Sequence, residues 1–147
     1  MAHVRQQIRQ RIGAVLSSGV TLVGGRVYRS RVYPLDASRL PAITVLTGSE
    51  TSNLMVMGSK TLDRTVSIFV DCYVSVKDTF DDDVDAIAVQ VEEAIAGDFT
   101  VNGLAKTAIL QSTEIDFSGE AETPIGVARL TYDVRYVTAI DNVETAN

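Results

Sequence analysis

Residues 64–76 read RTVSIFVDCYVSV, the most regular alternation of apolar and polar residues in the chain. Strict alternation over this length predicts a β-strand with one face turned to a core. The second face carries Phe69 and Tyr73, too many aromatics for a wet surface, so we expect another element or another subunit to cover it. The apolar face would consist of Val66, Ile68, Val70, Cys72, Val74 and Val76.

One amphipathic helix is expected before this strand in the sequence and a second one after it. Apolar residues at helical spacing predict one helix over residues 4–16, ending near the Ser-Ser-Gly at 17–19. The second follows Thr79, a residue type that favours the N-cap, and ends at Gly97, a natural C-cap. Its first turn holds Asp81–Asp83, whose negative charge complements the helix dipole.

The remaining segments predict a sheet around the central strand. The stretch 48–62 is rich in Ser, Thr, Gly and Asn and lacks periodicity, so we predict a long loop there. The predicted fold class is α/β (α+β), a single mixed, largely antiparallel sheet with two helices packed against it. One domain is expected over residues 1–139, followed by a flexible C-terminal tail at 140–147. The other predicted strands are 26–33, 42–47, 106–117 and 125–138, the last two paired as an antiparallel hairpin.

Charge is distributed unevenly along the 147 residues. Seven arginines and one aspartate lie within residues 1–40, whereas the rest of the chain holds six basic and eighteen acidic residues. Such a bipolar chain suits head-to-tail self-association; the alternative is that both sets are solvated faces of one domain. The net charge of −6 argues against nucleic acid as the main partner. The sequence has no run of roughly 20 apolar residues and no signal-peptide pattern, so we expect a soluble protein made in the cytoplasm.

Residues for catalysis are sparse. His3 is the single histidine and Cys72 the single cysteine, so a nucleophile triad is hard to assemble and Cys72 is expected to serve packing. The cluster Asp81–Asp83 with Asp85 lacks the alternating spacing and central glycine of a calcium loop. A solvated helix start or an acidic docking face explains it better than a metal-dependent enzyme. We therefore predict no catalytic residues, no cofactor and no metal.

Interaction surfaces are the better candidates for function. Arginines in the early turns of the first helix oppose its dipole, which a partner surface would explain. Those in the strand at 26–33 form either a basic edge or a surface for a partner. Flexible apolar side chains at residues 54–57 would be exposed in a monomer; they either tuck onto the core as a lid or order on binding, which we favour. The candidate interface residues are Arg5, Arg9, Arg26, Arg29, Arg31, Leu54, Met55, Val56, Met57, Asp81 and Asp82.

Four segments, taken in order, carry a family resemblance. They are Val32-Tyr33-Pro34 followed by Leu40–Val45, the strand at 64–76 after its glycine- and serine-containing loop, the Asp-rich helix, and Leu130–Tyr136. In these segments and in the order of its elements, nearly the whole chain resembles the tail terminator family of long-tailed phages, typified by the minor tail protein U of lambda-like phages.

The resemblance implies a non-enzymatic virion protein with a tail-tube-like fold. It would form a homo-hexameric ring at the head-proximal end of the tail, cap the tail tube, end tail polymerisation and offer a docking surface to the head. Its partners would be itself, the tail-tube protein and a head connector or completion protein, with no sequence-specific nucleic acid and no membrane. The family's flexible loop would correspond to residues 48–62. The alternative is a head-tail joining adaptor, or an equivalent ring protein of a contractile injection machine.

Overall fold

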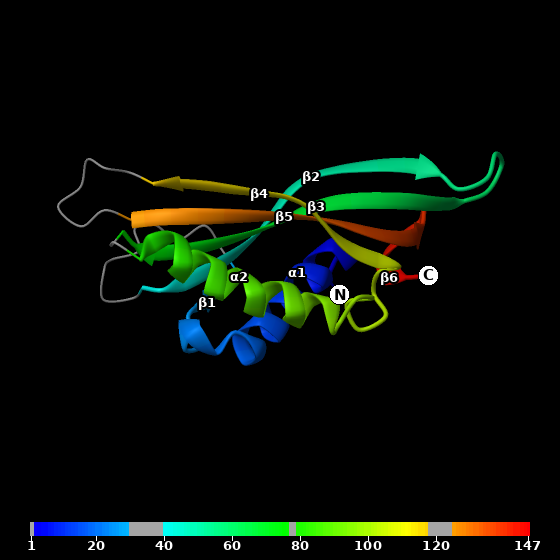
Figure 1. Ribbon diagram of the computed structural model, residues 1–147. Helices are drawn as coiled ribbons and strands as arrows, with labels where there is room; N and C mark the ends of the chain where they lie inside the picture. Colours follow the sequence, from blue (N-terminus) through cyan, green and yellow to red (C-terminus); the bar gives the residue numbers. More distant parts are fainter. Residues whose placement is uncertain (1, 30–39, 77–78, 118–124) are drawn as a thin grey trace.

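The computed structural model describes residues 2–29, 40–76, 79–117 and 125–147 (Figure 1). Within them the chain forms two α-helices, a short 3-10 helix and a six-stranded sheet. The elements, in order, are α1 (Val4–Gly19), η1 (Thr21–Val23), β1 (Val27–Tyr28), β2 (Ala42–Leu54), β3 (Thr61–Ser75), α2 (Phe80–Ala96), β4 (Thr107–Phe117), β5 (Ile125–Ala139) and β6 (Asn142–Ala146).

The sheet is mixed but mostly antiparallel. Its strand order is β1-β2-β3-β5-β4, with β6 paired to the end of β5. Among the described strands only β1 and β2 run parallel, and β4 and β5 form the predicted antiparallel pair. Both α-helices lie on one face of this curled sheet, as Figure 1 shows. The predicted fold class is therefore confirmed.

The core lies between that face and the helices. The apolar residues of β3 occupy it as predicted, and Val66, Ile68 and Val70 are fully buried. Each helix contributes one apolar stripe. The ring of Phe80 in α2 packs directly on the backbone of Gly126 in β5, where an added Cβ would stand 2.0 Å from Cε2 of Phe80. The buried residues of the helices are Val4, Ile8, Ile12, Gly13 and Leu16 in α1 and Phe80, Val84, Ile87, Val91 and Ile95 in α2.

The second face of β3 is partly covered from within the chain. The guanidinium of Arg129, on the neighbouring β5, lies 4.3 Å from the centre of the Phe69 ring. Arg129 also donates two hydrogen bonds to the Asp71 carboxylate, at 2.9 and 3.0 Å. Tyr73 packs with Ala42 in a small second cluster and is only 8% exposed. A further subunit on this face stays a prediction.

The prediction of a loop at 48–62 is wrong for more than half of these residues. Strand β2 continues to Leu54 and pairs with β3 through Ser52↔Arg64 and Leu54↔Leu62, which leaves only residues 55–60 as a turn. Strand pairing supplies the backbone hydrogen bonds here whatever the side chains, so polar composition does not prevent a strand. The register shifts between Thr47 and Glu50. Gly48 lies in this bulge, where a Cβ would stand 2.7 Å from Cζ of Phe69.

Two further segments differ from prediction. Residues 142–146 were expected to fray, but they form β6, paired to β5 through Thr138↔Ala146 and Ala139↔Asn142. The predicted strand at 26–33 is observed at Val27–Tyr28, and its residues from 30 onward lie outside the described part of the chain.

Candidate assembly interface

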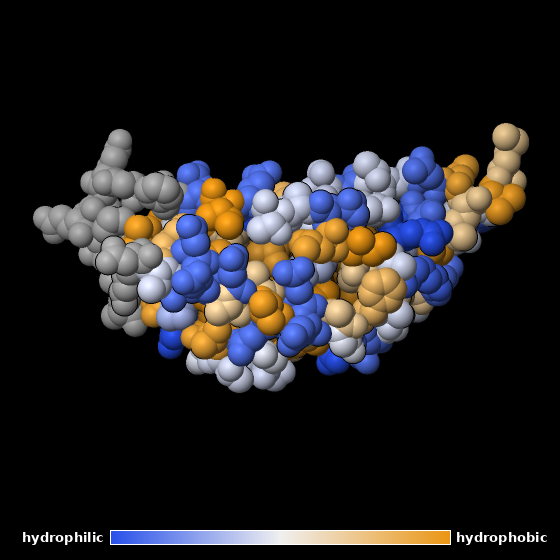
Figure 2. Space-filling model, viewed as in Figure 1, coloured by the Kyte–Doolittle hydropathy of each residue, from blue (hydrophilic) through white to orange (hydrophobic). Residues whose placement is uncertain are grey.

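The β2–β3 hairpin projects beyond the body of the molecule and ends in an apolar tip, residues 54–57 (Figure 1). The hydrophobic colour at that projecting end is visible in Figure 2. Exposure is 51% for Leu54, 48% for Met55, 66% for Val56 and 96% for Met57. The turn is closed by its own backbone, since Ser59 N donates to the Val56 carbonyl at 2.9 Å. The tip is therefore not a lid on its own core.

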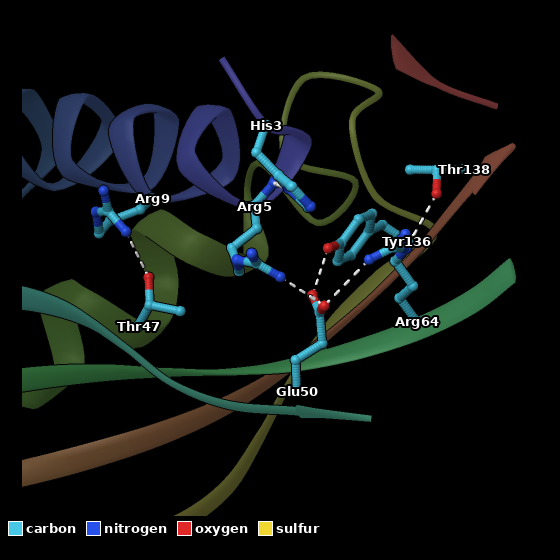
Figure 3. A network of polar contacts seen from close by, with 8 residues as sticks. All are labelled: His3, Arg5, Arg9, Thr47, Glu50, Arg64, Tyr136 and Thr138. Atoms are coloured by element: carbon cyan, nitrogen blue, oxygen red, sulfur yellow. Dashed lines mark hydrogen bonds and ion pairs between the residues drawn. The ribbon is translucent and has the colours of Figure 1, made fainter. Parts of the chain in front are cut away.

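A charged cluster holds the base of this hairpin (Figure 3). The Glu50 carboxylate, just beyond the bulge in β2, accepts hydrogen bonds from Nη1 of Arg5 at 2.6 Å and Nη1 of Arg64 at 3.3 Å. The Tyr136 hydroxyl donates to its other oxygen. Nε of Arg64 donates to Oγ1 of Thr138 at 3.0 Å. The cluster thereby joins α1, β2, β3 and β5.

The cluster is shielded from water, which strengthens its electrostatics. The side chains of Glu50 and Arg64 are 12% and 10% exposed. Burial, and then the hydrogen bond to Glu50, raises the pKa of Tyr136, so its hydroxyl remains a donor. His3 caps α1 by accepting from the Arg5 backbone N–H at 3.1 Å. Burial, followed by the charges of Arg5 and Arg64, lowers the pKa of His3, which favours the neutral imidazole that this bond requires.

The predicted interface arginines are engaged mainly within the chain. Besides Arg5, Arg9 donates to Oγ1 of Thr47 at 2.7 Å and Arg26 to the Pro41 carbonyl at 2.8 Å. The aliphatic part of Arg29 lies across Gly13 of α1. Arg31 lies outside the described residues. These contacts fasten α1 and β1 to the sheet, so a role of the described arginines toward a partner stays a prediction.

The acidic candidates lie at the other end of the molecule. Asp81 and Asp82 are exposed in the first turn of α2, far from the hairpin tip. Beside them is an apolar pocket of about 280 Å³, whose lining includes Leu22, Pro41 and Ile87. The interface candidates that the structure describes thus do not form one site: they divide between the hairpin tip, the contacts of α1 and β1, and the start of α2.

Sequence reasoning missed the Glu50 cluster and the pocket. One signal for the cluster was present, because Arg64 has the same parity along β3 as Val66 and Ile68 and so points to the core. A charge on the buried face of a strand requires a buried partner. Nothing in the sequence singled out Glu50 as that partner, since a bulge sets its register. The pocket joins segments distant along the chain.

The described residues give little support for a catalytic or metal centre. No group of three or more His, Cys, Asp or Glu residues among them is arranged to hold a metal ion. Burial raises the pKa of the Cys72 thiol to about 12, which leaves it protonated and unreactive at neutral pH. In the part of the chain that the structure describes, no helix has the length and apolar character to cross a membrane.

Comparisons with known proteins add little to this geometry. No protein-family model and no curated protein matches the sequence. A chain of the solved structure "Virion of native gene transfer agent (GTA) particle" is similar over 90% of both chains, with 15% sequence identity and a TM-score of 0.45. A similarity of that size carries no argument about function, which has to come from the chain itself.

Proposed function

We propose that the chain is a non-enzymatic structural component of a phage-like virion and that it acts by assembly. The observation that carries this proposal is the hairpin tip, whose four apolar side chains are about half to almost fully exposed. Apolar residues gathered at a projecting end are costly in a free monomer and are typical of a surface that another protein covers.

The finer proposal is a tail terminator: a ring at the head-proximal end of the tail that caps the tube and stops its polymerisation. The sequence resemblance described above supports this choice. The Glu50 cluster supports a tail terminator, because it ties the β2–β3 hairpin to α1 and β5 and so holds the projecting end of the hairpin at a defined angle. A pre-organised arm loses less conformational entropy on docking than a flexible loop would.

Electron microscopy of tails tests this proposal. In cells that produce the particle but lack the chain, we expect tubes that exceed the normal length and carry no heads, and the wild-type chain should restore both. The double variant Met55→Ser/Met57→Ser should fold but restore neither. Val89→Gln, which changes an exposed residue of α2 away from the tip, is the matched control and should restore both. Normal tails in the absence of the chain would rule the proposal out.

A further inference from the structure

The hairpin tip lies at one end of the paired strands β2 and β3, whose course Figure 1 shows, and the lining of the apolar pocket includes residues at the other ends of these strands. We infer that the tip of one copy seats in the pocket of a second copy, so that the chain self-associates head to tail. This inference rests on the proposed assembly function and adds the partner and the receiving site.

The spacing of the two features excludes an intramolecular contact. The pocket includes Pro41 at the start of β2 and Val74 and Ser75 at the end of β3, whereas the tip lies at the other ends of the same strands. Strand β3 spans Thr61–Ser75, and at about 3.3 Å per residue the two ends are roughly 45 Å apart. Both strands are paired along this length, so the arm cannot fold back onto its own pocket.

The size and chemistry of the two features match. A cavity of about 280 Å³ is small for a cofactor-sized ligand, which usually occupies 300–1,000 Å³, but it accommodates one or two side chains. Met57 is 96% exposed at the end of the arm, and its unbranched thioether adapts to irregular apolar gaps. Leu22 lines the pocket and is itself 47% exposed, so a seated methionine would cover apolar surface on both copies.

Charge is also complementary. Among the described lining residues of the pocket, Asp83 alone is charged, and Asp81 and Asp82 stand exposed in the same turn of α2. Lys60 is the last residue of the hairpin turn and is exposed close to the apolar tip. A seated tip would bring this cation to the acidic start of α2, which favours the correct partner and orientation.

A contact in which one copy uses its tip and the other copy uses its pocket joins two different surfaces and is therefore heterologous. Repetition of such a contact closes into a ring or continues as an open filament, depending on the rotation between copies. Within the proposed function the ring is the expected outcome, and each tip then occupies the pocket of the neighbouring copy.

Sedimentation velocity of the full chain over a concentration series tests the contact. Met57→Ser at the tip and Ala86→Gln at the exposed edge of the pocket should each raise the dissociation constant at least about 10-fold. Both positions are exposed, so circular dichroism should show an unchanged fold. The control Val89→Gln, one turn further along α2 and outside the described pocket lining, should associate like the wild type.

Mixing the two variants gives a sharper result. The Ala86→Gln chain retains its tip and the Met57→Ser chain retains its pocket, so an equimolar mixture should form heterodimers with near wild-type affinity and no larger species. The inference is overturned if the wild type stays monomeric, if either variant associates normally, or if the mixture shows no complementation. The tail-length assay reads the proposed function separately, because a chain that fails here but still limits tail length retains that function.

Discussion

Replacement of Glu50 by alanine tests whether the hairpin base depends on the charged cluster. The change removes the acceptor of Arg5, Arg64 and Tyr136 together. Arg64 decides the cost, since its side chain is 10% exposed and would keep its bond to Thr138 and its approach to the Tyr136 ring but no counter-ion among the described residues. Leaving a buried charge without its counter-ion costs about 3 kcal/mol or more. Arg5, at 36% exposed, can turn to water and contributes about 1 kcal/mol at most.

Urea unfolding followed by circular dichroism measures this cost. With a slope of about 2 kcal/mol per molar urea, the midpoint of Glu50→Ala should fall by roughly 1.5 M. Arg5→Ala should lower it far less. Glu93→Ala, at an exposed position of α2, is the matched control and should change the free energy of unfolding by no more than about 0.5 kcal/mol.

A double variant separates charge pairing from simple truncation. Glu50→Ala combined with Arg64→Met removes both buried charges, so most of the lost stability should return. The reasoning is refuted if Glu50→Ala costs no more than Arg5→Ala, because the cluster would then behave as a solvated surface pair.

Three further predictions concern other parts of the chain. NMR of the single imidazole should show the pKa of His3 below 6.5 in the native wild type, and this pKa should rise in Arg5→Ala. Because the unfolded wild-type chain binds a proton at His3 more readily than the native chain, the free energy of unfolding should decrease as pH falls below about 6.5. His3→Asn keeps a capping side chain and should abolish that part of the decrease. A normal or raised His3 pKa would contradict this. Cys72 should react with a thiol reagent only at the rate of unfolding, since it is fully buried with its pKa raised to about 12, and rapid labelling of the native chain would show the packing to be wrong. Gly126→Ala should destabilise the fold by about 1–3 kcal/mol, because the new Cβ would meet the ring of Phe80, and adding Phe80→Leu should recover part of the loss; an unchanged melting temperature would show that the ring moves freely.

The sequence predicted the elements whose side-chain pattern is strong. The strand at 64–76, both helices and the pair of β4 and β5 were found close to the expected residues, because burial of one face imposes a period that local inspection detects. The exposed apolar tip could also be anticipated from Leu54 to Met57 in a polar context.

The structure differs from the sequence-based prediction in segments that form strands by backbone pairing although their side chains show no apolar–polar alternation. Residues 48–53 lack apolar side chains and are mostly exposed, yet they extend β2 because β3 offers a long partner. The same holds for β6, a short polar strand at the edge of β5. Pairings between distant residues, such as Arg5 with Glu50, depend on the register at the bulge, which one sequence does not reveal.

Electron microscopy of the purified full chain tests the central claim most directly, because assembly through self-contact is what the tip, the pocket and the family resemblance have in common. The account predicts closed rings of uniform size with sixfold symmetry, which disappear in Met57→Ser. Isolated monomers at every concentration, together with no binding to tail tubes, would contradict it.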